Sequence, residues 1–187
     1  MLQLRASSLA DTHAIAAAVA SLARAGDTIL LAGGMGAGKT AFAQGFGRAL
    51  GVDEPITSPT FTLVHSYDLP ATQRRARTLH HADLYRLDRT SEVAELALSE
   101  LAEFGGIVLI EWGDVVEGAF GDHLTVLLEP ELVEGDDGDD GGDDGDDGDD
   151  DDSRVIADGH RRIALAGVGQ SWAARWDRLE WSLEAFQ

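Results

Sequence analysis

Glycines surround the only lysine of this 187-residue chain. Residues 33–40 read Gly-Gly-Met-Gly-Ala-Gly-Lys-Thr and lie between a short apolar run and a segment that we expect to be helical. Glycines let a backbone wrap closely around a polyphosphate, and amides at a helix N-terminus donate hydrogen bonds to its oxygens. The residues match the Walker A pattern at every fixed position. They predict a phosphate-binding loop in which Lys39 contacts the β and γ phosphates and Thr40 ligates Mg²⁺.

The chemistry of Lys39 supports this interpretation. Every other Lys or Arg side chain of the chain is one of thirteen arginines. A compact ammonium fits beneath phosphates where a planar guanidinium would be misplaced, so this position requires lysine although the rest of the chain does without it. The weaker alternative is an incidental Lys-Thr in a glycine-rich turn between a strand and a helix.

Two acidic residues end predicted strands and can supply the carboxylates that hydrolysis needs to hold Mg²⁺ and orient water. Glu111 directly follows the apolar run 107–110, an arrangement that delivers an acid beside the loop. Asp83 ends a second predicted strand, although its spacing alone fits a solvent-exposed acid equally well. His80 and His81 precede it without a third well-spaced ligand group, so we interpret them as structural and predict no zinc site.

Thr60 lies in a Ser-Pro-Thr-Phe segment after the helix that follows the loop. Other P-loop hydrolases have a mobile segment here, whose threonine senses the γ-phosphate and Mg²⁺. Thr60 is therefore a candidate switch residue. A simple turn leading into a strand explains the same residues equally well, because proline fixes the backbone angle and threonine favours strands.

Apolar periodicity predicts alternating helices and strands. Ser8 is a candidate N-cap for a helix that Gly26 stops, and the run 28–32 is typical of a strand buried on both faces. We expect further helices ending at 50, over 91–103 and from about 171, and strands at 60–67, 78–83, 107–110, 124–128, 154–157 and 161–165, the last three antiparallel. This order predicts an α/β, P-loop NTPase-like three-layer fold, with a mixed β-sheet and helices on both faces, in a single domain spanning residues 1–187.

The last predicted helix carries an apolar stripe. Trp172, Trp176, Leu179 and Leu183 are spaced four, three and four residues apart and share one helical face. We interpret the stripe as core packing, with an exposed partner-binding surface as the alternative.

A tract of glycine and aspartate at about 134–152 interrupts the later strands. It holds twelve aspartates and no apolar side chain, so burial cannot offset the entropy of ordering it. We expect a disordered acidic insertion. Calcium binding is the weaker alternative, because the tract lacks the apolar position of Gly-rich calcium repeats and the final glutamate of an EF-hand loop.

The charge of the chain argues against direct contact with nucleic acid. The net charge is −20, and removing the twelve unit charges of the tract leaves −8. A negative surface repels phosphate backbones, and the sequence offers no basic stripe. Any RNA involvement is therefore expected through a partner.

The sequence also suggests a location. It contains no cysteine, no apolar run of the ~20 residues that a membrane span needs, and no N-terminal secretion signal. We expect a soluble, cytoplasmic protein without a membrane partner.

Four motifs together resemble the TsaE (YjeE) family. They are the P-loop, Ser-Pro-Thr-Phe-Thr-Leu at 58–63, His-x-Asp-x-Tyr-Arg-Leu at 81–87 and Ile-Glu-Trp at 110–112, and the resemblance runs from about 11 to 126. It implies an ATPase that uses ATP and Mg²⁺ and works with TsaB-like and TsaD-like subunits, which transfer threonylcarbamoyl to the tRNA adenosine next to the anticodon. The chain would then meet tRNA only indirectly, through the complex.

The resemblance also implies roles for individual residues. Thr40 and Glu111 map to magnesium-site residues, Asp83 to a residue needed for hydrolysis and Trp112 to an aromatic near the nucleotide. The start of the first helix, at Asp11 and Thr12, maps close to the nucleotide as well. The expected nucleotide contacts are Asp11, Thr12, Met35, Gly36, Ala37, Gly38, Lys39, Thr40, Ala41 and Trp112, and the expected catalytic residues are Lys39, Thr60, Asp83 and Glu111.

Two features depart from the family pattern. Ala41 stands where a second threonine often follows, and the acidic tract is not a general family feature.

Other functions receive less support. A small-molecule kinase would share the loop, but Arg74, Arg75 and Arg77 lie in a short connection and not in an obvious lid. A GTP-dependent switch would need an Asn-Lys-x-Asp tetrad, which the sequence lacks. A nucleotide-binding scaffold without hydrolysis remains an alternative, since partners can complete such sites.

Overall fold

The computed structural model describes residues 1–87, 96–134 and 154–187. The predicted helix over 91–103 lies partly outside these ranges, and so does almost all of the acidic tract. In chain order the elements are β1 Leu2–Ala6, α1 Leu9–Leu22, β2 Thr28–Ala32, α2 Lys39–Leu50, β3 Val64–Asp68, β4 Thr78–Asp83, α4 Leu98–Glu103, β5 Gly106–Glu111, η1 Gly113–Ala119, β6 His123–Glu134, β7 Arg154–Val168, η2 Ala173–Arg175, α5 Trp176–Ser182 and η3 Glu184–Phe186.

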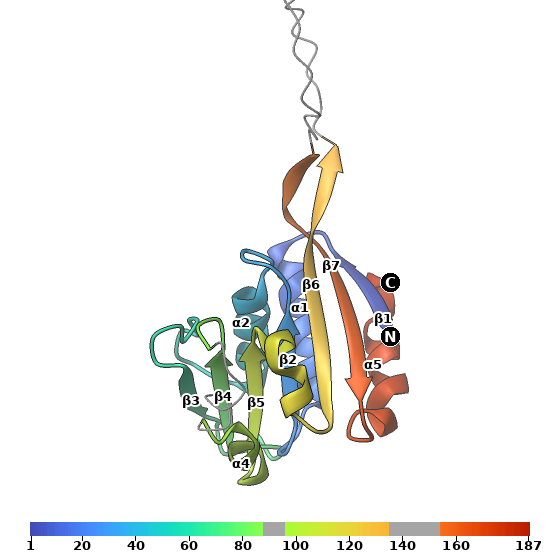
Figure 1. Cartoon of the computed structure of the whole chain (residues 1–187). Coiled ribbons are helices and arrows are strands. Elements are labelled where there is room, and N and C mark those ends of the chain that lie inside the picture. Colours follow the sequence, from blue (N-terminus) through green and yellow to red (C-terminus); the bar gives the residue numbers. More distant parts are fainter. Residues whose placement is uncertain (88–95, 135–153) are drawn as a thin grey trace, which may run out of the picture.

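The strands form one seven-stranded mixed sheet with the order β1-β7-β6-β2-β5-β4-β3 (Figure 1). β2 lies between β5 and β6 and runs parallel to both, and β4 runs parallel to β5. The two edges are antiparallel, with β3 on β4 and β1 on β7. Ligands of open α/β sheets bind beyond the carboxyl ends of the parallel strands, so the ends of β2, β4 and β5 are where a site is expected.

Alternating side chains of the central strands pack into two different cores. Ile29 and Leu31 of β2 join α1 and α2 in the larger core, whereas Leu30 joins α4 in the smaller one. In β5, Ile107 and Leu109 face the larger core, and their neighbours face the smaller one. A strand with both faces covered must be apolar throughout, which explains the uninterrupted runs in the sequence. The predicted three-layer α/β fold is confirmed.

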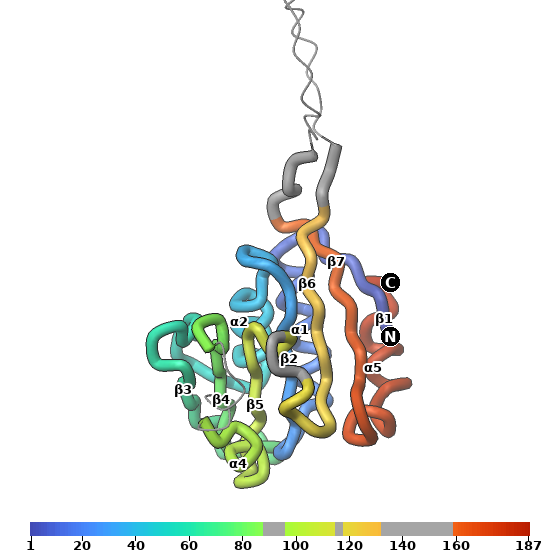
Figure 2. The backbone as a smooth tube through the Cα atoms, in the orientation of Figure 1, coloured from blue at the N-terminus to red at the C-terminus, as the bar shows by residue number. Residues whose placement is uncertain are grey.

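The first helix begins as predicted, whereas the last helix, expected from about residue 171, is a 3-10 turn, η2, followed by the short α5 from Trp176. The Ser8 side chain accepts a hydrogen bond from the amide of Asp11 and caps α1. Near the C-terminus, Trp172, Leu179 and Leu183 are fully buried in the larger core and Trp176 is partly buried against it, so the apolar stripe is core packing. The two chain ends lie close together beside β1 (Figure 2).

Four details differ from the sequence-based predictions. The strand expected over 60–67 begins only at Val64, because Leu63 adopts a left-handed backbone with φ 62° and residues 60–62 form a turn. β6 was expected to be antiparallel; it is antiparallel to β7 but parallel to β2. The segments 154–157 and 161–165 belong to one strand, and β1 was not predicted at all.

The described helices include none that is both long and apolar enough to cross a lipid bilayer.

Candidate functional site

The phosphate-binding loop leaves the carboxyl end of β2 and enters α2. Gly38 is the N-cap of α2 with φ 103°, a left-handed conformation that favours glycine. Gly33 also has a positive φ, and a Cβ there would lie 2.2 Å from the carbonyl oxygen of Leu128 in β6. The loop glycines are thus fixed by backbone conformation and by the close approach of a neighbouring strand.

Lys39 is folded back over the loop and is only 5% exposed. Its Nζ donates hydrogen bonds to the carbonyl oxygens of Gly33 and Gly34, at 2.7 and 2.8 Å, and lies 3.6 Å from the centroid of the Trp112 ring. Burial lowers the pKa of the Lys39 ammonium, and the nearby carboxylates, with Glu111 foremost, partly oppose this shift. The ammonium is therefore held at the loop but incompletely solvated, which favours exchange of its carbonyl contacts for phosphate oxygens.

Glu111, Thr40 and His81 form what we call the strand-end cluster. The Thr40 hydroxyl, at the first turn of α2, donates to the Glu111 carboxylate, with its oxygen 2.9 and 3.1 Å from Oε1 and Oε2. His81 Nε2 lies 2.9 Å from Glu111 Oε1, and both side chains are almost completely buried. Because a carboxylate only accepts, His81 Nε2 donates, and its buried Nδ1 has no partner among the described residues.

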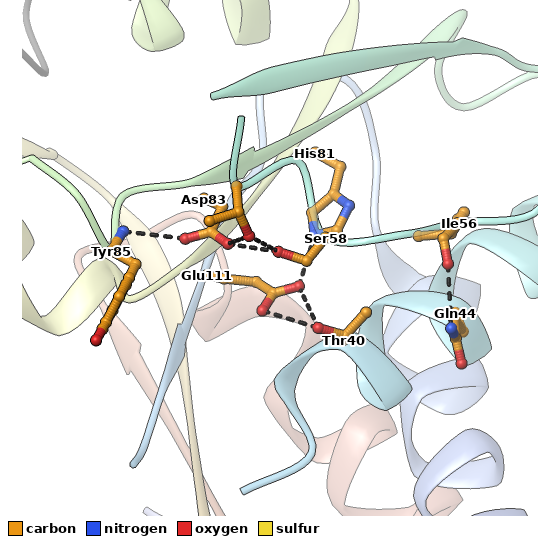
Figure 3. Close-up of polar contacts among 9 residues, drawn as sticks. Thr40, Gln44, Ile56, Ser58, His81, Asp83, Tyr85 and Glu111 are labelled. Atoms are coloured by element: carbon orange, nitrogen blue, oxygen red, sulfur yellow. Dashed lines mark hydrogen bonds and ion pairs between the residues drawn. The ribbon is translucent and has the colours of Figure 1, made fainter. Parts of the chain in front are cut away.

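Asp83, Ser58 and Thr60 form a second group, the loop cluster. Figure 3 shows the contact between Ser58 and Asp83 next to that between Thr40 and Glu111. Both hydroxyls donate to Asp83 Oδ2, Thr60 at 3.0 Å, and the Ser58 and Thr60 oxygens are 2.8 Å apart. Asp83 Oδ1 accepts from the amide of Tyr85 at 3.0 Å. These hydrogen bonds hold the segment that carries Thr60 against the end of β4. Asp83 is therefore buried, and it is not the solvent-exposed strand-end acid that its spacing alone also allowed.

The two clusters lie side by side because of strand register. Asp83 and Glu111 are direct partners across the parallel pair β4 and β5. Residues two apart along a strand share a face, so Asp83 follows His81 and Leu79 toward the side of the sheet that α2 covers. Both carboxylates therefore face the beginning of α2.

A cavity of about 380 Å³ opens between the loop and the two clusters. All the predicted catalytic residues line it, and so does every predicted nucleotide contact from Met35 to Ala41. Trp112 lies on one side with a left-handed backbone, φ 62°, and its ring centroid is 4.9 Å from that of Tyr85. The lining consists of Met35, Gly36, Ala37, Gly38, Lys39, Thr40, Ala41, Ser58, Thr60, Asp83, Tyr85, Glu111 and Trp112.

The donor set fits Mg²⁺. Thr40 Oγ1 and the Glu111 carboxylate are hard oxygen ligands already in contact, and Asp83 lies on the adjacent strand. Mg²⁺ is usually bound by one or two carboxylates together with substrate phosphates and water. Among the described residues no group of three or more His, Asp or Glu could hold a metal alone, so the remaining ligands would have to come from a nucleotide and solvent.

Asp11 and Thr12 are not among the cavity-lining residues. Asp11 accepts a hydrogen bond from the amide of Ser7, and the Thr12 hydroxyl donates to the carbonyl of Ser8. Both side chains thus serve the start of α1, and their contact with nucleotide stays a prediction.

Three residues in or next to the cavity were not predicted from sequence to belong to the site. His81 was interpreted as structural, yet it contacts Glu111 directly. Ser58 and Tyr85 were only motif positions, but the Ser58 hydroxyl donates a hydrogen bond to Asp83, and the Tyr85 ring contacts the Trp112 ring at a tilt of 46°. The alternation of His81 and Asp83 on one strand face was the signal that could have linked the histidine to the site.

Comparison with known proteins identifies relatives of this chain in both sequence and fold. The family model described as threonylcarbamoyl adenosine biosynthesis protein TsaE matches residues 6–134. The tRNA threonylcarbamoyladenosine biosynthesis protein TsaE of Bacillus subtilis is 39% identical over 110 residues, which cover 57% of this chain and 63% of that protein. The protein of the same name from Treponema pallidum is 30% identical over 156 residues, covering 83% and 93%. The crystal structure of Bacillus subtilis YdiB superposes with a TM-score of 0.65 at 26% identity, covering 98% and 94% of the two chains.

Proposed function

The chain belongs to the TsaE family, and from that premise we propose that it binds and hydrolyses ATP in support of a complex of TsaB-like and TsaD-like subunits. That complex would transfer threonylcarbamoyl to the tRNA adenosine next to the anticodon, in the cytoplasm. The observation that carries the proposal is the direct bond between Thr40 of the loop and Glu111 of β5, with Asp83 as the neighbouring acid.

Each part of the cavity has a task in phosphoryl transfer to water. Amides of the loop bind the phosphates, and Lys39 moves from the carbonyls of Gly33 and Gly34 to the β and γ phosphate oxygens. Thr40 and Glu111 would hold Mg²⁺, and the bound ion would supply positive charge to neutralise the negative charge that develops on the phosphates. Asp83 accepts a hydrogen bond from the attacking water and orients it toward the γ-phosphate.

The composition of the cavity lining supports slow hydrolysis by the chain alone. Lys39 is the only Lys or Arg among the described lining residues. P-loop hydrolases accelerate strongly when an arginine joins the transition state, supplied within the chain or by a partner. We therefore expect partner subunits to raise the rate of hydrolysis.

Charge supports indirect contact with tRNA. The chain carries a net charge of −20, which disfavours approach to a phosphate backbone. The TsaB-like and TsaD-like subunits would accordingly hold the tRNA, and this chain would drive or reset them.

The decisive experiment is reconstitution of tRNA modification with purified TsaB-like and TsaD-like proteins, with and without this chain, over many turnovers. Wild type should restore multiple-turnover modification and release phosphate. Lys39→Ala should abolish both, because the loop then lacks its only ammonium. Full modification without the chain, or wild-type hydrolysis by the variant, would contradict the proposal.

Nucleotide binding can be followed through Trp112. Its ring contacts the Lys39 ammonium, so exchange of that contact for phosphate should change the indole environment. We expect tryptophan fluorescence to change with saturable dependence on ADP in the wild type and not in Trp112→Phe. An unchanged wild-type signal at saturating ADP would place the tryptophan outside the nucleotide site.

A further inference from the structure

Arg161 of β7 contacts the phosphate-binding loop from outside the cavity. Its Nε donates to the carbonyl oxygen of Ala37 at 2.9 Å, and its Nη1 donates to the carbonyl oxygen of Gly159 at 3.0 Å. The side chain lies so close to Gly38 that a Cβ there would be 2.4 Å from Nε. Arg161 is absent from the cavity lining, so its effect on a bound nucleotide would pass through the loop.

The contact fixes the orientation of one peptide group. In a planar trans peptide the C=O of one residue and the N–H of the next point in opposite directions. The carbonyl of Ala37 is aimed at Arg161 behind the loop, so the amide of Gly38 is aimed the other way, to the cavity side. Gly38 is the N-cap of α2, a position whose amide has no acceptor within the helix. Within the described part of the chain, the Gly38 amide also has no other backbone acceptor.

Losing the contact would affect this orientation. Ala37 is completely buried, and its carbonyl would lose a charged donor if Arg161 were removed. A buried acceptor without a partner is costly, and rotation of the Ala37–Gly38 peptide toward another donor would relieve that cost. The same rotation would withdraw the Gly38 amide from the phosphates.

The neighbouring arginine has a different environment. Arg161 alternates with Ile163 and Leu165, which face the larger core, whereas Arg162 points to the opposite face of the sheet. The Arg162 side chain is 60% exposed and lies 3.7 Å from Glu129. Two adjacent arginines of equal charge thus differ in their contact with the loop, which makes Arg162 a matched control.

We propose that Arg161 is a positioning residue for nucleotide binding, which holds the Ala37–Gly38 peptide so that the Gly38 amide points at the phosphates of an adenine nucleotide. This inference rests on the proposed function, because it assigns a further determinant of affinity to the same site. It also gives a residue of β7 a role in nucleotide binding, although β7 lies outside the segment that the family model matches.

The test compares Arg161→Met with Arg162→Met, two variants that lose the same charge one residue apart. Titration with a fluorescent ADP analogue should show affinity falling about tenfold in Arg161→Met, consistent with loss of one charge-assisted hydrogen bond. Arg162→Met should stay within about twofold of wild type. Equal affinities of Arg161→Met and wild type, or equal losses in both variants, would overturn the proposal.

A second measurement covers the case in which Arg161→Met folds poorly. Arg161→Lys keeps the charge and one donor, so it should fold and lose part of the affinity. In the nucleotide-free protein, the NMR signal of the Gly38 amide should move in Arg161→Lys and stay in place in Arg162→Met. An unmoved Gly38 signal would overturn the inference.

The outcomes separate the two proposals. Failure of the wild type to bind any adenine nucleotide would refute the proposed function, while the Gly38 signal would still test the Arg161 contact. Wild-type binding together with an unaffected Arg161→Met would refute only the role of Arg161.

Discussion

The strand-end cluster and the loop cluster border the same cavity but are built differently. In the strand-end cluster, Thr40 lies in the first turn of α2, and both Glu111 and His81 lie on buried strands. In the loop cluster, Asp83 ends a strand, but its two hydroxyl partners lie in a segment without regular structure that ends at Leu63 with φ 62°. One cluster is anchored by the sheet, whereas the other depends on a turn.

This difference suggests separate roles. Buried strands with paired neighbours are the least mobile parts of a protein, whereas irregular segments with few buried contacts open more easily. The strand-end cluster is therefore suited to holding Mg²⁺ in a fixed place. The loop cluster can rearrange when a γ-phosphate arrives, which is the behaviour predicted for a switch residue at Thr60.

Glu111→Gln should produce the largest effect, because it neutralises the carboxylate of the strand-end cluster while preserving its shape. We expect ATP turnover, measured as phosphate release, to fall about a thousandfold. Glu129→Gln, a change at a half-exposed carboxylate near Arg162, should leave turnover unchanged. Wild-type turnover in Glu111→Gln would remove the distinction between the two clusters.

Asp83→Asn should have the next largest effect. The amide can still accept from Ser58 or Thr60, but it lacks the charge that orients water, so we expect turnover to fall about a hundredfold. Calorimetry should show ADP affinity within about twofold of wild type, since the loop and Lys39 are intact. Asp68→Asn, at the exposed end of β3, serves as the control. A large loss of ADP affinity would instead give Asp83 a role in binding.

Thr60→Val should reduce turnover only about fivefold, because Ser58 still donates to Asp83. The effect should appear with ATP and not in the affinity for ADP, if Thr60 responds to the γ-phosphate. Thr57→Val changes an exposed residue of the same segment and should behave as wild type. Equal losses in both variants would indicate a general disturbance of the turn.

His80 should show the smallest effect, and only on stability. Burial lowers its pKa from the ordinary value of 6.5, so the unfolded chain binds protons more readily and stability falls as pH drops below 6.5 toward the lowered pKa. His80→Gln should lose less stability than wild type over that window, as measured by urea unfolding at several pH values. Turnover at neutral pH should be unchanged, because His80 bonds Ser66 on β3 and not the strand-end cluster. Parallel pH dependence of stability in both proteins would contradict this assignment.

Local patterns were sufficient for much of the fold and the site. The loop at 33–40 follows from its motif. The buried runs of β2 and β5 and the acid at the end of β5 follow from short-range spacing, because each buried strand must be apolar along its length. The N-cap of α1 at Ser8 could also be predicted, because the capping hydrogen bond joins residues only three apart in the chain. Errors concentrated where tertiary contacts override local preference. β1 is a short edge strand whose pairing partner lies 155 or more residues away, and the left-handed Leu63 delays β3.

The sequence by itself determined that a phosphate-binding loop is present and that Glu111 and Asp83 each end a strand, since motif order and periodicity are local properties of the chain. Only the tertiary structure decided three hydrogen bonds: from the Thr40 hydroxyl to Glu111, from the Thr60 hydroxyl to Asp83, and from the Arg161 guanidinium to the carbonyl of Ala37. These pairs are 71, 23 and 124 residues apart. Contacts over such separations depend on strand order, register and the packing of side chains between layers, which no short segment encodes alone.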